Sequence, residues 1–64
     1  MPQAIDGLIT ALQDTNAAVR SAAAQSLGHL KKSTAIPALI NALQDPSPQV
    51  RAMVVWAMDE IEMN

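Results

Sequence analysis

The chain has no cysteine, no phenylalanine and no tyrosine, and it contains only one histidine, one tryptophan and two glycines. Without cysteine a disulfide framework is excluded, and a single histidine disfavours a structural or catalytic metal site. No apolar run approaches the roughly 20 residues that a membrane-spanning helix needs. From these absences we expect no metal, no cofactor and no membrane partner.

Charge is also scarce. Four lysines and arginines against six acidic residues give a net charge of -2 and a pI near 4.9. Nucleic-acid binding needs several cations gathered on one face, so this balance argues against a nucleic-acid partner. Residues 1–4 lack the basic and then apolar start of a secretory signal, which predicts a soluble, cytoplasmic protein.

The length of 64 residues predicts one small domain over 1–64, with half of its residues hydrophobic. A chain this short buries only about 60% of its unfolded surface, so its core is thin. Small domains usually gain the missing stability from a disulfide, a metal or a partner chain. With the first two disfavoured, we expect a homo-oligomer.

The sequence repeats itself with a period of 31 residues. Residues 4–33 align without gaps to residues 35–64, and ten of the thirty pairs are identical. A fixed period of this length is typical of stacked structural repeats. We therefore expect repeat one at 4–34 and repeat two at 35–64.

Each repeat contains two helical patterns separated by turn-forming residues. The first places apolar residues on one face, and the second covers about 17–31 in repeat one and 48–62 in repeat two. Ser47 followed by Pro48 predicts an N-cap with proline in the first helical turn, and Ser33 and Thr34 are expected to cap the third helix. The apolar positions of the first patterns are Ile5, Leu8, Ile9 and Leu12, and Ile36, Leu39, Ile40 and Leu43.

A sequence motif recurs at corresponding positions of the two repeats. In repeat one it comprises Ala4, Leu8, Ile9, Leu12, Asp14, Val19, Arg20, Ala23, Ala24, Leu27, Gly28 and Leu30, and in repeat two Ala35, Leu39, Ile40, Leu43, Asp45, Val50, Arg51, Val54, Val55, Met58, Asp59 and Ile61. This pattern resembles the HEAT-like repeat of the phycobilisome-lyase type. The resemblance implies an all-α fold, an α-solenoid of two HEAT-like helical hairpins with four helices, although the second half of repeat two departs from the pattern.

Two pairs of opposite charge recur, Asp14 with Arg20 and Asp45 with Arg51, each six residues apart across a turn. One interpretation of these pairs is a catalytic role. The resemblance implies instead that the four side chains are structural, capping the turns and linking neighbouring repeats. Buried or half-buried turn groups need partners of this kind.

The stock of catalytic groups is poor. The chain has no cysteine or tyrosine that could act with His29 as a catalytic partner. The acidic residues near the C-terminus lack the second histidine that a transition-metal site would need. No catalytic residue is assigned, and we expect no enzymatic activity.

The last helix has apolar residues around much of its circumference. At about 100 degrees per residue, one face is expected to form core, and a half-polar face with Asp59 is expected to end the array. The core face holds Val50, Val54, Ala57, Met58 and Ile61, and the half-polar face holds Arg51, Val55, Asp59 and Glu62.

The remaining face of the last helix centres on Trp56 and is the predicted binding surface. A tryptophan flanked by two methionines is typical of an anchor in a protein interface. The resemblance implies that this face is concave and binds partners. The alternative is that Trp56 folds down over a thin, alanine-rich core. The predicted partner-binding residues are Ala52, Met53, Trp56, Glu60 and Met63, with Gln25 and His29 from repeat one.

The sequence thus predicts a non-enzymatic protein-protein interaction module that presents a concave helical surface and self-associates through it. One alternative is a subunit or fragment of a phycobilin lyase, because those proteins resemble this repeat. A second alternative is an excised or designed piece of a longer solenoid, whose exposed face results from the cut.

Overall fold

The computed structural model describes residues 2–62, with side chains described from Ala4 to Glu62. Over this range the chain forms α-helices and a single short 3-10 turn, and no strand. The helices are α1 (Pro2–Ala11), α2 (Ala17–Leu30), α3 (Ile36–Ala42) and α4 (Pro48–Glu62), with the 3-10 turn at Ser33–Ala35.

The second helix of each hairpin begins at a side-chain cap. Asn16 Oδ1 accepts hydrogen bonds from the backbone N–H of Ala18 at 2.8 Å and of Val19 at 3.3 Å. Ser47 Oγ accepts from the N–H of Val50 at 3.4 Å, and Pro48 follows as the first residue of α4. The predicted cap at Ser47 is therefore confirmed, and both caps satisfy amides that an α-helix leaves without a partner.

The segment between α2 and α3 differs from its prediction. Lys31 closes α2 in the left-handed region with φ 55°, and its N–H donates to the Leu27 carbonyl at 3.1 Å. Ser33 and Thr34 then form the 3-10 turn instead of capping α3, whose N-cap is Ala35 with no side-chain hydrogen bond. The predicted cap is wrong because carbonyls of the turn already accept the first amides, and Pro37 has no N–H to donate.

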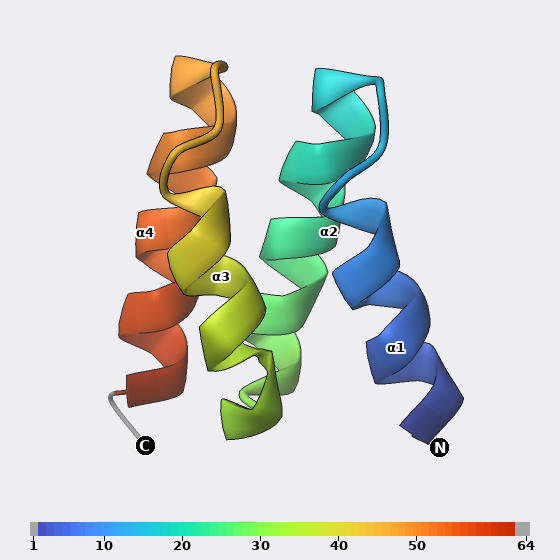
Figure 1. The fold of residues 1–64 in the computed structure, drawn as a ribbon. Helices are drawn as coiled ribbons and strands as arrows, with labels where there is room; N and C mark the ends of the chain where they lie inside the picture. The colour runs from blue at the N-terminus through green and yellow to red at the C-terminus, as the bar shows by residue number, and fades with distance from the viewer. Residues whose placement is uncertain (1, 63–64) are drawn as a thin grey trace.

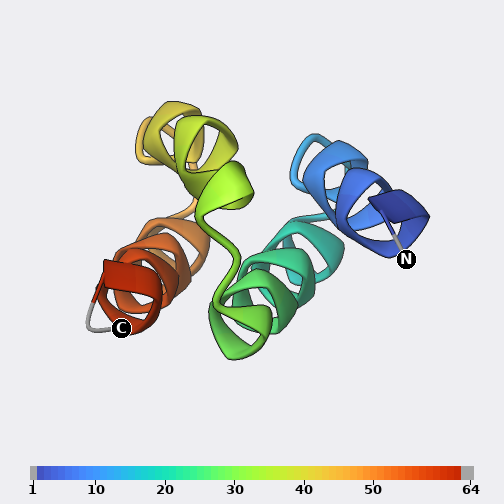
Figure 2. The ribbon, with the colours of Figure 1, turned by 90° about the horizontal axis from the view of Figure 1, so that it is seen from below.

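The helices form two layers. In Figure 1 α1 packs on α2 and α3 packs on α4, so each pair is a helical hairpin. Figure 2, which looks nearly along the helices, shows α2 and α4 side by side in one layer, while α1 and α3 lie apart in the other. The fold is all-α, a short α-solenoid in which the second helices are joined along their length.

The core lies mainly along the seam between α2 and α4. Gly28 permits this close approach, because a Cβ at Gly28 would lie 2.9 Å from the Cα of Ala57. Met58 belongs to the predicted core face of α4 but is only half-buried. Leu27 holds the equivalent position on α2 and is covered by α4, whereas nothing in the described part of the chain covers Met58 in the same way. The buried hydrophobic residues are Leu12, Ala23, Ala24, Leu27, Ala35, Leu39, Val50, Val54, Ala57 and Ile61.

Candidate protein-interaction surface

An open groove of about 630 Å³ is lined by residues of α2 and α4. Its residues recur at helical spacing, so they share one side of each helix. None of them carries a charge, and the largest apolar side chains among them come from α4. The lining residues are Ser21 and Gln25 from α2 and Gln49, Ala52, Met53 and Trp56 from α4.

Trp56 is the last of the α4 residues that line this groove, and it is half-buried. Its ring lies close to Gly28, since a Cβ on that glycine would lie 2.5 Å from Cζ3 of the indole. The ring also meets His29 edge to face, with ring centroids 5.1 Å apart and an interplanar angle of 69°. The indole therefore packs against its own core, as the alternative interpretation expects, and it also lines the groove.

The other predicted contact residues differ in exposure. Met53 is half-buried and packs against the core, whereas Ala52, Gln25 and His29 are exposed. Glu60 is half-buried, and its carboxylate lies 3.9 Å from the Lys31 ammonium. Met63 lies outside the described residues.

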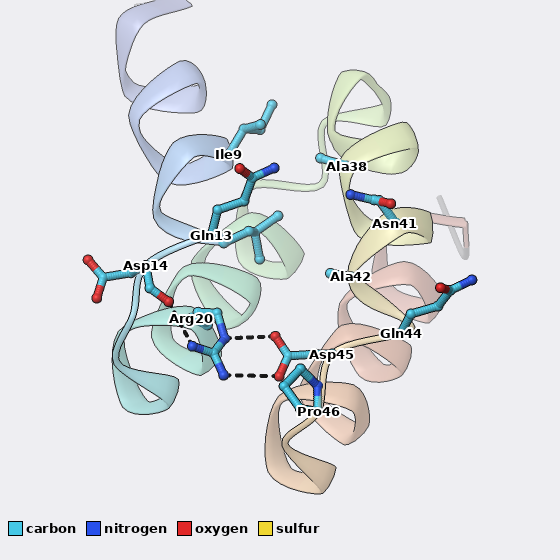
Figure 3. Close-up of a pocket in the computed structure, with 11 residues that line it drawn as sticks. Ile9, Gln13, Asp14, Arg20, Ala38, Asn41, Ala42, Gln44, Asp45 and Pro46 are labelled. Carbon is cyan, nitrogen blue, oxygen red and sulfur yellow. Dashed lines mark hydrogen bonds and ion pairs between the residues drawn. The ribbon is translucent and has the colours of Figure 1, made fainter.

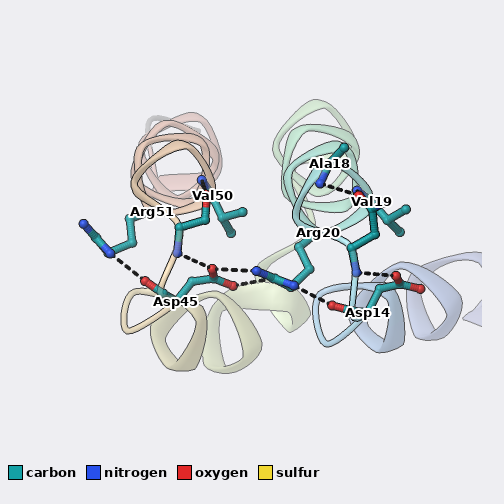
Figure 4. Close-up of polar contacts among 9 residues, drawn as sticks. Asp14, Ala18, Val19, Arg20, Asp45, Val50 and Arg51 are labelled. Carbon is teal, nitrogen blue, oxygen red and sulfur yellow. Dashed lines mark hydrogen bonds and ion pairs between the residues drawn. The ribbon is translucent and has the colours of Figure 1, made fainter.

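A ladder of arginine and aspartate lies at the end of the molecule where the hairpins turn (Figure 4). Arg20 Nε donates to Asp45 Oδ2 at 2.7 Å and its Nη2 to Oδ1 at 3.1 Å, which is a bidentate pair between the two hairpins. Arg20 Nη1 donates to the Asp14 carbonyl at 2.7 Å, and Arg51 Nη1 donates to the Asp45 carbonyl at 2.7 Å. Each arginine thus binds its own turn through a backbone oxygen, and Arg20 also joins the turn of the next hairpin.

The Arg20 hydrogen bond holds the pKa of the Asp45 carboxyl below its ordinary value of 3.8. The backbone N–H of Ser47 also donates to Asp45 Oδ1, at 2.9 Å, and lowers the same pKa. Charge-assisted, bidentate pairs of this kind are the stronger class of hydrogen bond. The Asp45 side chain therefore caps its own turn and, through Arg20, links the two hairpins.

A second cavity, of about 380 Å³, lies between α1 and α3 (Figure 3), and sequence reasoning missed it. Its polar groups include the amides of Gln13, Asn41 and Gln44, together with the Arg20–Asp45 pair. No local pattern reveals this cavity, because it exists only where α1 and α3, the first helices of the two hairpins, lie apart from each other. Among the described residues, no group of three or more His, Asp or Glu side chains is placed to hold a metal ion.

Known protein families provide an independent comparison. A family model described as HEAT repeats matches residues 5–64, which is nearly the whole chain. The chain belongs to the HEAT-repeat family. HEAT repeats are generally protein-interaction modules and generally have no enzymatic activity. A comparison with curated proteins finds no match to this chain.

The HEAT-repeat assignment fits the geometry described above. Its two helical hairpins, stacked with α2 and α4 in one layer, form the helical solenoid expected of this family. Within residues 2–62, no helix is both long and apolar enough to cross a bilayer.

Proposed function

We propose that this HEAT-repeat chain is a non-enzymatic, cytoplasmic interaction module that binds a protein partner in the groove between α2 and α4. The observation that carries the proposal is the placement of Met53 and Trp56, both half-buried, on the groove wall. Their inner sides pack on the core and hold them in place. A pre-organised anchor loses less conformational entropy on binding than a mobile one.

The chemistry of the groove favours an apolar helix or loop of a partner. Aromatic and methionine side chains are enriched in protein interfaces, and a polar rim excludes water around them. Here the rim consists of Ser21, Gln25 and Gln49, whose uncharged groups are less costly to desolvate than ions. Glu60 and His29 flank the same surface and extend the proposed contact area.

We further propose that a second copy of the chain is one such partner. A two-fold axis would bring the same patch of both copies together, so Trp56 of each copy would cover the groove of the other. Met63 is included in this proposed patch on its sequence position. The thin core of a two-hairpin stack favours such an association, because it would bury further apolar surface.

A phycobilin-handling role is the second candidate function. The groove volume of about 630 Å³ lies within the range of small-molecule sites, and an indole offers a flat face for a tetrapyrrole. Titration of the chain with a bilin would test this candidate by a red-shifted absorbance. An unchanged bilin spectrum would contradict it.

The interaction proposal is tested by Trp56→Ala and by Val55→Ala as a matched control, since Val55 is exposed and lies about 100° around α4 from Trp56. We expect Trp56→Ala to weaken self-association by about 2 kcal/mol, or roughly thirtyfold, because interface tryptophans commonly contribute that much. Sedimentation equilibrium at micromolar concentration would measure it. A wild-type chain that stays monomeric, or equal effects of the two variants, would contradict self-association.

Binding of other proteins needs a separate test. A photo-crosslinking residue at Met53 should join the chain to partner protein in its native cells, whereas the same residue at Val55 should not. Equal crosslinking from both positions would contradict the assignment of the groove as the binding surface.

A further inference from the structure

One side of α4 carries a straight stripe of side chains that is distinct from the groove. The spacing of i, i+4, i+7 and i+11 keeps the four positions within about 60 degrees of arc around the helix. Val55 is 56% exposed, Arg51 and Glu62 are also exposed, and Met58 is half-buried. Trp56 lies about 100 degrees around α4 from Val55. The outer stripe consists of Arg51, Val55, Met58 and Glu62.

A hollow of about 310 Å³ lies beside the outer stripe. The 31-residue period places Leu43 at the position of Leu12 and Val55 at the position of Ala24. Leu12 and Ala24 are buried between the hairpins, whereas Leu43 is 37% exposed. The face therefore combines uncovered apolar surface with space for an added side chain. The hollow is lined by Leu43, Val55, Met58, Asp59 and Glu62.

This face does not suit a further hairpin stacked in the same way as the first two. A Cβ at Gly28 would lie 2.9 Å from the Cα of Ala57, and Asp59 stands 31 residues after Gly28. A hairpin stacked on α4 as α4 stacks on α2 would meet the Asp59 Cβ at that distance. An occupant of the outer stripe must therefore keep its backbone further away, and it must also match the charges of the stripe.

Arg51 offers hydrogen-bond donors at one end of the outer stripe. Its Nη1 donates to a backbone carbonyl of its own turn at 2.7 Å, as Nη1 of Arg20 does. Arg20 uses Nε and Nη2 to bind Asp45 of the neighbouring hairpin. Within residues 4–62 the same two nitrogens of Arg51 donate to no acceptor, and Figure 4 shows this guanidinium on the side of α4 away from the first hairpin. Two such donors are suited to a carboxylate.

Glu62 supplies a carboxylate at the other end, so the outer stripe is complementary to itself when reversed. Glu62 forms no ion pair with any other residue whose side chain is described. Relative to the midpoint between residues 56 and 57, Arg51 and Glu62 lie about 8 Å away in opposite directions along the helix. Val55 and Met58 lie about 2 Å from the same midpoint in opposite directions. A two-fold axis through this point would set Arg51 against Glu62 and Val55 against Met58.

We propose that the outer stripe of α4 is an interface between two copies of the chain, packed antiparallel about this two-fold axis. Arg51 of each copy binds Glu62 of the other, and Val55 of each copy enters the hollow beside Met58 of the other. Charge complementarity selects this arrangement, because a parallel pair of α4 helices would place like charges together at both ends.

The association is weak. A standard interface involves about 20 to 30 residues a side, and the outer stripe with its hollow provides far fewer. We expect a dissociation constant of about 100 μM or more. The face is therefore unoccupied at micromolar concentration, where Val55→Ala remains a control for the groove, and it binds no other protein. The outer stripe and the groove are separate surfaces, so either proposal can fail without the other.

Exchange of charges between two variants gives the direct test. Arg51→Glu alone and Glu62→Arg alone each place like charges at both ends of the interface, so each should self-associate through it at least about tenfold more weakly than the wild type. An equal mixture of the two variants restores both ion pairs. Sedimentation equilibrium at up to about 1 mM should therefore give a higher average mass for the mixture than for either variant alone.

The matched control is Asp6→Arg, which makes the same charge change as Glu62→Arg at an exposed position of α1. It should associate as the wild type does. Neither substitution of the outer stripe alters a residue that lines the groove, so association at Trp56 contributes equally to all samples. A mixture that associates no more than its separate components, or an equal loss from Asp6→Arg, would overturn the proposal.

A second measurement uses the wild-type chain and covers the case in which Arg51→Glu does not fold. Nitrogen–proton correlation spectra are recorded between about 50 μM and 1 mM. We expect the amide signals of Val55 and Met58 to shift with concentration along one common binding curve, whereas the Trp56 indole N–H reports the groove in the same spectra. If the indole signal shifts and the amides of the outer stripe do not, the proposal is overturned while the groove assignment survives.

Discussion

At the scale of single residues, the two glycines have opposite roles although both lie within helices. Gly28 lies on the seam, where an added Cβ would sit 2.5 Å from the Trp56 ring and 2.9 Å from the Ala57 Cα. Gly7 lies on α1, where an added Cβ would meet no atom within 4 Å. The same substitution should therefore have opposite effects at the two positions.

Gly28→Ala should lower the free energy of unfolding by up to about 2 kcal/mol, because overpacking costs about 1–3 kcal/mol and alanine regains about 1 kcal/mol of helix propensity. Gly7→Ala should raise it by up to about 1 kcal/mol, since only the propensity gain applies. Urea denaturation followed by circular dichroism measures both. A stabilising Gly28→Ala would show that the seam is looser than described.

At the scale of the elements, the helices follow from local sequence, and the exceptions have physical causes. The apolar spacing and the Ser47–Pro48 pair predicted α4 at its observed bounds, because both signals act within one turn of helix. Ser33 and Thr34 were assigned to a cap, yet backbone carbonyls of the 3-10 turn satisfy the amides that a cap would bind. The spacing of residues in the sequence does not distinguish a side-chain cap at Ser33 and Thr34 from a 3-10 turn at the same residues.

The cap at Asn16 should matter more than the cap at Ser47. Asn16 Oδ1 accepts two amide hydrogen bonds, whereas Ser47 Oγ accepts one at 3.4 Å, near the limit for such a bond. We expect Asn16→Ala to reduce stability by about 1 kcal/mol and Ser47→Ala by less. Thermal denaturation would compare them, with exposed Thr15→Ala as the control. Equal losses for all three would contradict a capping role.

At the scale of the whole molecule, the sequence shows which residues repeat but not which repeats touch. Asp14/Arg20 and Asp45/Arg51 stand out by their six-residue spacing, yet the side-chain ion pair joins Arg20 to Asp45, 25 residues away. Only the stacking of one hairpin on the other brings these groups together. The same holds for the separation of α1 and α3, which leaves the cavity between them.

The Arg20–Asp45 pair should make stability depend on pH. Because the folded-state pKa of Asp45 lies below 3.8, its contribution is fully present above about pH 4 to 5 and is lost as pH falls through the lowered pKa. We expect stability to fall as the pH drops below about 5 and through the lowered pKa, and Asp45→Asn to flatten this part of the profile. Urea denaturation across that range measures it, and an unchanged profile in Asp45→Asn would contradict the assignment.

An ion pair joins α2 or its adjoining residues to the second hairpin at each end of the seam between α2 and α4, and the two ion pairs differ in strength. At the turn end, Arg20 and Asp45 share two short bonds and are largely shielded from water, whereas at the other end Lys31 and Glu60 are more exposed and 3.9 Å apart. Added salt weakens exposed charge pairs far more than shielded ones. Rising ionic strength should therefore weaken the Lys31–Glu60 contact while leaving the Arg20–Asp45 contact largely intact.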